Sequence, residues 1–380
     1  EENSFAYLQM GIAPLATLWS GAIATAFGEN GSFSTTEGSF LMPYKAFFNG
    51  TFGAKPDVIN SSWGYPDAAG IDFFTRTVDG LARQNATVTL VVSAGNDGEG
   101  STNGLGSGFN AITVGGISGE RLPDGTFAHW ESASNGPAYF YNPETGEAVA
   151  NARATIHLAA PAKDLLLPAY LGHTGDNGDW PDPEPDPLPT DQYFLNVAGT
   201  SFSAPITAGA VSLLKDISYS NTVPGLNTEI ARDTRVIRSV LMAGAEATSG
   251  WDNGQEWVDG ILSTLQSLDY RTGAGALNVA ASAAVYREGT TDLAGFGGGL
   301  IAAQGWDYGT VSSATAGNDY FFTNPFAEET ELTISLNWFV NRAFDNALNL
   351  ASDESFVNLD LEVWSVAEGT LLELVATSHS

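Results

Sequence analysis

The stretch Asn196-Val197-Ala198-Gly199-Thr200-Ser201-Phe202-Ser203-Ala204-Pro205 is the most specific feature of this 380-residue sequence. It reads as a tight Gly-Thr-Ser turn that opens into a helix. A serine at a helix start has its hydroxyl near unpaired backbone N–H groups and the positive end of the helix dipole, which favours a developing oxyanion. Ser201 is therefore a candidate nucleophile. The alternative is that Ser201 only caps the helix, as serines before helices commonly do.

The sequence around this turn alternates short β-branched runs with longer helical patterns. We predict strands over 57–60, 87–92, 111–114 and 155–158, and helices over 71–83, 203–217, 234–246 and 278–287. Continuous apolar runs are typical of strands that are covered on both faces. The pattern predicts an α/β fold with a mostly parallel sheet flanked by helices.

The composition changes near residue 290, where the apolar pattern takes a period of two. Leu332, Ile334, Leu336, Trp338 and Val340 alternate with other residues, and a similar alternation follows over 359–363. This pattern predicts an antiparallel sheet with one buried face, as a small all-β sandwich-like domain. We therefore expect two domains, 1–288 and 289–380, the second of which lacks a closing strand.

The charge is strongly acidic, because 44 Asp and Glu against 14 Lys and Arg give a net charge of −30. Such a surface repels nucleic acid and anionic membranes, so neither is an expected partner. No segment reaches about 18 consecutive apolar residues, so we expect no membrane span. The chain has no cysteine, which excludes disulfides and thiolate sites. These features predict a secreted, extracellular bacterial protein.

Four segments, taken together and in this order, resemble the subtilisin-like serine proteases, or subtilases. They are Gly-Ile-Ala-Pro at 11–14, Val-Ile-Asn-Ser-Ser-Trp-Gly at 58–64, Ser-Ala-Gly-Asn-Asp-Gly at 93–98 and the serine motif at 199–205. The resemblance runs from about residue 11 to 285 and implies a subtilisin-like catalytic domain. It implies that Ser201 attacks the scissile carbonyl to form an acyl-enzyme. It also implies that Asn96 donates to the tetrahedral oxyanion, whereas the alternative is an ordinary turn residue.

The resemblance further implies a peptide or protein substrate, bound as an added strand beside Ser62, Trp63 and Gly64. Ser93, Ala94 and Gly95 would form the other wall of the first specificity pocket. Trp63 would either shape a neighbouring subsite or serve as a buried core aromatic.

The sequence departs from the family in one respect that affects catalysis. A subtilase needs an aspartate and a histidine before the Gly-Ile-Ala-Pro turn, but the ten residues before Gly11 contain neither. His129, His157, His173 and His379 all follow that turn, and we interpret them as structural. A serine without a general base is almost inert, so we expect this chain to be inactive alone.

Three explanations remain open. The upstream segment is cleaved but still associated, or it is missing from the sequence, or the protein is a catalytically dead scaffold for binding or assembly, for example as a homo-oligomer. Because the serine motif and Asn96 are intact and Glu1-Glu2 is an unusual start, we favour a missing segment that carries Asp and His.

Calcium is the only ion that the resemblance suggests, as a structural rather than a catalytic component. Acidic residues that could bind it occur at Asp176, Asp179, Asp182, Glu184 and Asp186. The alternative is that these acidic loops are simply solvated.

Overall fold

The architecture comes from a computed structural model. It describes residues 11–27, 33–100, 102–142, 145–168, 193–264, 266–288, 298–312, 317–327, 330–367 and 370–378. For residues 166, 168, 193–196, 370 and 371 it describes the backbone alone.

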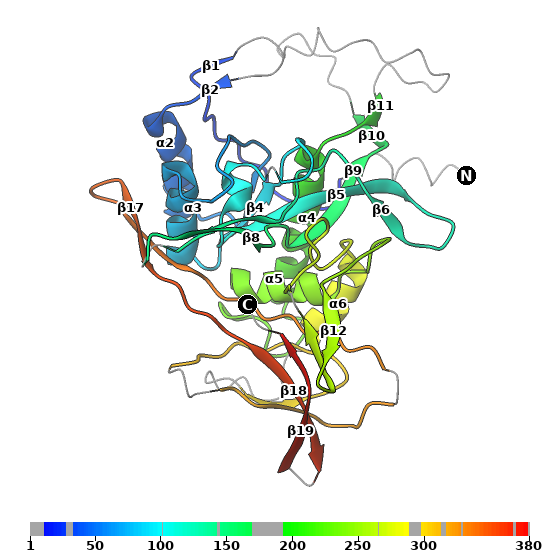
Figure 1. Cartoon of the computed structure of the whole chain (residues 1–380). Coiled ribbons are helices and arrows are strands. Elements are labelled where there is room, and N and C mark those ends of the chain that lie inside the picture. Colours follow the sequence, from blue (N-terminus) through cyan, green and yellow to red (C-terminus); the bar gives the residue numbers. More distant parts are fainter. Residues whose placement is uncertain are drawn as a thin grey trace.

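A mostly parallel sheet forms the centre of the molecule (Figure 1). Strands β3 (Val58–Ser61), β4 (Thr89–Ser93), β5 (Ile112–Arg121) and β9 (Leu158–Lys163) run parallel, and β6 (Phe127–His129) pairs antiparallel with β5. The predicted parallel sheet is therefore confirmed.

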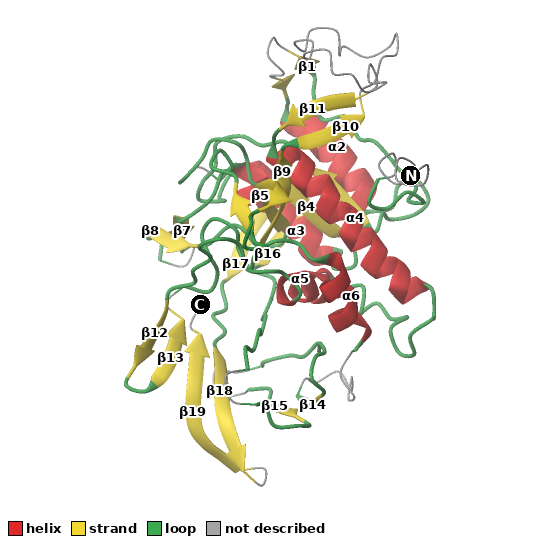
Figure 2. Cartoon of the chain, turned by 90° about the vertical axis from the view of Figure 1, so that its right-hand side faces the viewer, coloured by secondary structure: helices red, strands yellow, loops and turns green. Residues whose placement is uncertain are grey.

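Helices cover both faces of this sheet (Figure 2). Helices α4 (Thr200–Tyr219), α5 (Thr234–Ala243) and α6 (Val279–Arg287) contribute to one core cluster. Helices α2 (Glu37–Phe48) and α3 (Phe73–Gln84) contribute to the other.

Strand β4 shows how one apolar run serves both clusters. Its side chains alternate between the faces of the sheet, so Val91 belongs to the first cluster while Leu90 and Val92 belong to the second. This explains why the strand reads as a continuous apolar run rather than as an alternation.

Side-chain caps define where several helices begin. Asp72, Asp233 and Asn278 cap α3, α5 and α6, because each accepts a hydrogen bond from the first turn of its helix. Helix α2 was not predicted from the sequence, although Thr36 and Ser39 form a capping box at its start. Pro43 within α2 obscures the helical pattern.

Several predicted elements differ from those in the structure. The strand placed at 155–158 begins only at Leu158 and continues to Lys163. The helix placed over 234–246 ends at Ala243, followed by Gly244 as its C-cap. Residues 332–340 form no strand, although their apolar residues alternate. Side chains take up backbone groups there instead: Asn110 bonds both the N–H and the carbonyl of Val340, and Arg238 donates to the Trp338 carbonyl.

The remaining strands form small sheets around the core. They pair as β1 (Ala26–Phe27) with β2 (Phe33–Ser34), β7 (Ala138–Tyr141) with β8 (Ala148–Arg153), and β10 (Leu165–Pro168) with β11 (Tyr193–Val197). No described helix is long and apolar enough to cross a bilayer.

The C-terminal region is rich in strands, as predicted. Strands β18 (Leu361–Ala367) and β19 (Thr370–Ser378) join β12 (Gln255–Val258) and β13 (Ile261–Thr264) in one sheet, and β14 (Gly299–Ile301) pairs with β15 (Tyr320–Phe322). The hairpin of β16 (Asn341–Asp345) and β17 (Leu350–Ser355) contributes instead to the core on α3. The sandwich arrangement and the boundary at residue 288 stay predictions.

Candidate active site

Ser201 lies in the first turn of α4, one residue after the helix begins at Thr200. Gly199 is the N-cap residue, with φ of 157° and ψ of 139°, a conformation that glycine adopts far more readily than other residues. Ser201 is half-buried and does not cap the helix, so the capping alternative does not apply to it. Its hydroxyl and backbone N–H therefore lie at the positive end of a 20-residue helix.

Ser62 connects the end of β3 to this helix start. Its Oγ donates to the Ser201 carbonyl at 2.9 Å, and the Ser201 Oγ lies 3.4 Å from the Ser62 carbonyl oxygen. The second contact is long for a hydroxyl hydrogen bond. The Ser201 hydroxyl is thus positioned by a weak contact that a general base could replace.

Thr200 connects the end of β4 to the same helix start. The Gly95 N–H donates to the Thr200 Oγ1 at 3.1 Å, and the Thr200 N–H donates to the Asn96 Oδ1 at 2.9 Å. The Thr200 hydroxyl also lies 3.0 Å from both the Gly95 carbonyl and the Asn96 Oδ1. These bonds fix the Asn96 amide against the first residue of α4.

The orientation of the Asn96 amide follows from these bonds. Because its oxygen faces Thr200, its Nδ2 is the group left to donate, and within the described residues that nitrogen has no hydrogen-bond partner. The side chain is exposed, and the Nδ2 would lie 3.7 Å from a Cβ atom added to Gly199. A donor therefore lies beside the turn that carries Ser201.

The two predicted substrate walls follow adjacent parallel strands. Ser61 pairs with Val92, so Ser62, Trp63 and Gly64 follow β3 at the same edge of the sheet where Ser93 ends β4 and Ala94 and Gly95 follow it. Gly95 has φ of 111°, which other residues rarely adopt. The six residues therefore lie on the two segments that reach Ser201 from the sheet.

The Trp63 side chain belongs to an aromatic cluster beside α2. Its ring packs edge-on against Phe40 at 5.8 Å between centroids, and its Nε1 donates to the Tyr44 hydroxyl at 3.1 Å. The indole is half-buried against the core cluster that contains these residues. These contacts favour the core alternative for the ring.

Neither described histidine hydrogen-bonds Ser201. His157 is half-buried, the Thr113 N–H donates to its Nδ1 at 3.0 Å, and desolvation together with nearby Arg238 lowers its pKa well below the usual value. Burial also lowers the pKa of His129 in β6. Both are neutral at pH 7, in keeping with structural roles. His173 and His379 lie outside the described residues.

The acidic residues suggested for calcium, between 176 and 186, also lie outside the described residues. In the part of the chain that the structure describes, no three His, Cys, Asp or Glu side chains gather as a metal would require. Calcium binding therefore stays a prediction.

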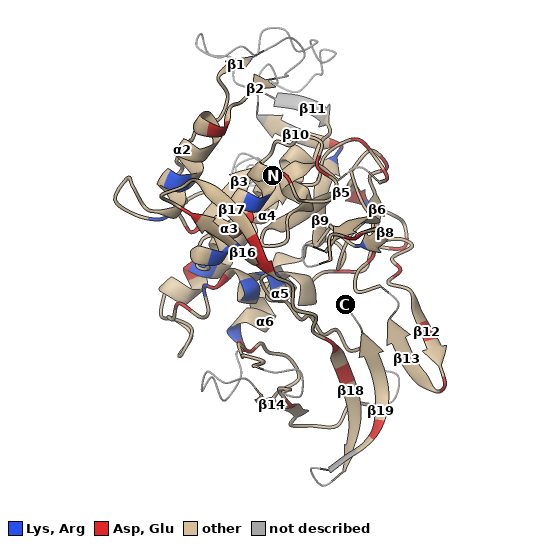
Figure 3. Cartoon of the chain, turned by 60° about the vertical axis from the view of Figure 1, so that its left-hand side comes forward, with Lys and Arg blue, Asp and Glu red and all other residues tan. Residues whose placement is uncertain are grey.

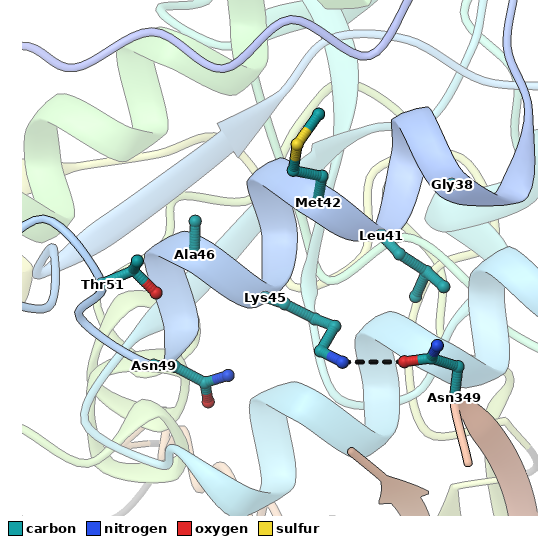
Figure 4. A pocket seen from close by; sticks show the side chains of 8 residues that line it. All are labelled: Gly38, Leu41, Met42, Lys45, Ala46, Asn49, Thr51 and Asn349. Atoms are coloured by element: carbon teal, nitrogen blue, oxygen red, sulfur yellow. Dashed lines mark hydrogen bonds between the residues drawn. The ribbon is translucent and has the colours of Figure 1, made fainter. Parts of the chain in front are cut away.

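A surface hollow lies elsewhere on the molecule (Figure 4). Its volume is about 440 Å³, and it lies along α2, where Lys45 Nζ donates to the Asn349 Oδ1 at 2.7 Å. None of the residues singled out from the sequence lines it. It is therefore separate from the helix start at Ser201.

A serine in the first turn of a helix, with an amide side chain fixed beside it at the edge of a parallel sheet, is suited to stabilising an oxyanion, as in α/β proteins of the serine-hydrolase class. More narrowly, the chain belongs to the subtilase family, whose model matches residues 8–275. This match confirms the resemblance that the four sequence segments indicated. No curated protein sequence matches the chain.

Several solved structures are similar to this chain. The prenylagaramide maturation protease PagA is 19% identical, with 67% of this chain and 69% of that chain covered and a TM-score of 0.43. The patellamide maturation protease PatA is 20% identical, with 69% and 73% covered and a TM-score of 0.42. Fervidolysin from Fervidobacterium pennivorans, a keratinolytic enzyme related to subtilisin, is 18% identical, with 70% and 31% covered and a TM-score of 0.39.

The structure brings two further residues to the site that the sequence motifs do not identify. Thr200 was quoted within the serine motif, but its hydrogen bonds to Gly95 and Asn96 depend on the packing of α4 beside β4. Asn103 lies on the loop after β4 and contacts both walls. A local pattern could not have identified Asn103, because its neighbours are up to 39 residues away in sequence.

Proposed function

We propose that this chain is the serine-bearing part of a subtilisin-like endopeptidase. In this proposal the Ser201 Oγ attacks the substrate carbonyl while its proton passes to a general base, and the new Oγ–C bond gives a tetrahedral oxyanion. The C–N bond then breaks as the base returns the proton to the leaving amine, and water hydrolyses the acyl-enzyme. The substrate is a peptide held between the segments 62–64 and 93–95.

The observation that carries this proposal is the hydrogen bond from the Thr200 N–H to the Asn96 Oδ1. Because this bond engages the amide oxygen, the Asn96 Nδ2 is the group that would donate to an oxyanion formed on a carbonyl attacked by Ser201. The Ser201 N–H at the end of the helix would be the second donor.

The general base would come from a segment outside the described residues. In support, the His157 ring is hydrogen-bonded to the Thr113 N–H, and the Ser201 Oγ has a backbone carbonyl as its neighbour. In this proposal the 380-residue chain is inactive until a segment that supplies histidine and aspartate joins it. Secretion and the acidic surface are part of the same proposal and rest on composition alone.

The test is labelling of the full-length protein from its source with an alkyl fluorophosphonate, followed by mass spectrometry. We expect Ser201 to be modified in the wild type, and no label in Ser201→Ala. Asn96→Ala should label more slowly by about 10²–10³-fold, which is the loss known for removal of this donor in subtilisin itself. Equal labelling of an exposed serine and of Ser201 would contradict the proposal.

The second candidate function is a catalytically dead scaffold for binding or assembly. The observation that favours it is the contact of the Ser201 Oγ with the Ser62 carbonyl rather than with a base. Absence of Ser201 labelling in the full-length protein, with a folded chain by circular dichroism, would support the scaffold and exclude the endopeptidase.

A further inference from the structure

The side chain of Asn103 occupies the crevice between the two walls that lead to Ser201. A Cβ atom added to Gly64 would lie 2.7 Å from the Asn103 Cβ, and one added to Gly95 would overlap the Asn103 Nδ2. Real Cβ atoms do not approach other atoms so closely. One residue from the loop after β4 therefore fills the space that separates Gly64 from Gly95.

Three hydrogen bonds fix Asn103 in this crevice. Its N–H donates to the Ala94 carbonyl at 3.0 Å, on one wall, and the following Gly104 N–H donates to the Tyr65 carbonyl at 2.7 Å, next to the other wall. The side chain itself is held by a 3.3 Å bond from the Nδ2 to the Asp97 Oδ2. Because the backbone is bonded to both segments, Asn103 cannot leave without opening the crevice.

The crevice is where the side chain of a bound substrate residue must go. The Ser201 Oγ lies next to the Ser62 carbonyl and Asn96 is bonded to Thr200, so the attacked carbonyl lies between the ends of β3 and β4. In the proposed binding mode, the residue that carries this carbonyl would place its side chain between the two segments, where Asn103 lies.

We propose that Asn103 is a specificity-determining residue, which limits the substrate residue on the acyl side of the cleaved bond to glycine, alanine or serine. This inference rests on the proposed function and names its substrate class. Protein interiors are close-packed, so a phenylalanine or leucine would have to displace the Asn103 side chain and break its bond to Asp97. A small side chain needs no such movement.

Binding of peptide amides tests the inference without any need for Ser201 to react. The titration uses two acetylated tetrapeptide amides, which are identical except that the last residue is Ala in one and Phe in the other. Each peptide is added to the 380-residue chain, and its binding is followed by NMR. Amides are used because the chain carries a net charge of −30, which would repel a carboxylate. We expect the Ala peptide to bind more tightly than the Phe peptide by at least about tenfold.

Substitution of Asn103 should abolish this preference. In Asn103→Gly, and in Asn103→Ala as a second variant that restricts the backbone more, the Phe peptide should gain at least about tenfold in affinity. The matched control is Asn221→Gly, at the far end of α4, where φ of 54° already suits glycine. That control should keep the wild-type preference.

The outcomes separate this inference from the proposed function. Equal binding of both peptides to the wild type, or an unchanged preference in both folded Asn103 variants, would overturn the inference even if Ser201 is labelled by the fluorophosphonate. If the Ala peptide binds more tightly than the Phe peptide but Ser201 is not labelled, the role of Asn103 in specificity is supported and the proposed peptidase activity is excluded.

Discussion

Thr200 is the residue that holds the Ser201 turn together. It is fully buried, and its hydroxyl lies within hydrogen-bond distance of the Gly95 N–H, the Gly95 carbonyl and the Asn96 Oδ1. One side chain thus joins the loop after β4 to the first turn of α4. The position of the Asn96 amide depends on Thr200 as much as on Asn96 itself.

Thr200→Val should therefore reduce both stability and reactivity. Valine has the same shape but leaves the buried Gly95 N–H without a partner, so we expect a loss of about 1–3 kcal/mol in the free energy of unfolding, measured by urea denaturation. Labelling of Ser201 should slow in parallel. Thr200→Ser, which keeps the hydroxyl, should restore most of both, and equal stability of Thr200→Val and wild type would refute this role.

Local sequence was sufficient to identify some site residues and insufficient for others. Ser201 and Asn96 stand in short motifs with glycine neighbours, so their turn could be recognised from composition and order. Asn103 stands in no such motif, and its role follows only from its position between Gly64 and Gly95.

Helix α4 is fastened to the sheet at its far end by a buried lysine. The Lys215 Nζ donates to the backbone carbonyls of Asp57 and Thr87, at 2.6 and 2.7 Å, just before β3 and β4 begin. Burial lowers the pKa of Lys215 to about 7, although the nearby carboxylates of Asp57 and Asp233 act in the opposite direction. The helix that carries Ser201 is therefore anchored by a group that titrates near neutral pH.

Lys215→Met should remove a pH dependence of stability. Because the pKa of this lysine is lower in the folded chain than its usual 10.5, the unfolded chain binds more protons between about pH 7 and 10, and stability rises with pH in that window. The stability of the wild type relative to Lys215→Met should therefore increase from pH 7 to 10 in thermal unfolding. If the difference in stability between the wild type and Lys215→Met does not change with pH, the lowered pKa of Lys215 is contradicted.

The β16–β17 hairpin is attached to helix α3 by buried charges. The Arg342 Nη1 donates to the Asp79 Oδ2 at 2.9 Å and its Nε donates to the Asp353 Oδ1 at 2.6 Å. Arg342 and Asp79 are 1% and 0% exposed, and Asp79 also accepts the backbone N–H groups of Phe109 and Asn110. Figure 3 shows basic and acidic segments close together around α3, α5 and β16.

Arg342→Met should be strongly destabilising, because it leaves the Asp79 carboxylate buried without its cation. Loss of one partner of a buried ion pair costs about 3–5 kcal/mol. Arg76→Met is the matched control, since Arg76 is part of the same network but reaches Asp353 at 3.7 Å and is 34% exposed. That variant should lose less than about 1 kcal/mol in urea denaturation. Similar losses in the free energy of unfolding for Arg342→Met and Arg76→Met would show that burial of the arginine does not determine the cost of its removal.

The molecule as a whole joins residues that are far apart in the sequence into one core. Phe344 and Ala351 of the hairpin belong to the same buried cluster as Val78 and Leu81 of α3. Gly80 permits this packing, because a Cβ atom there would lie 2.9 Å from the Ala343 carbonyl carbon. The β16–β17 hairpin therefore packs against α3 and completes the buried cluster to which α2 and α3 contribute (Figure 1).

A chain that ends at residue 288 should consequently be unstable. It lacks Phe344, whose truncation alone would cost about 3–5 kcal/mol as a buried phenylalanine, and it exposes the apolar face of α3. A chain that ends at residue 357 keeps the hairpin and should unfold cooperatively. Limited proteolysis and thermal unfolding compare the two, and equal stability would support an independent domain over 1–288.

By itself, the sequence determined the parallel sheet, four of the helices and the serine turn. Strand runs such as 87–92 and motifs such as Gly199-Thr200-Ser201 carry their structural preference within a few residues, as backbone torsions, caps and side-chain periodicity.

Only the tertiary structure decided which distant residues meet. It brought Asn103 between the two walls, Lys215 to the start of the sheet and Arg342 to Asp79. The physical reason is that such contacts depend on how whole elements pack, and a buried charge or amide is stable only where packing supplies its partner. No local pattern records a partner that lies 263 residues away.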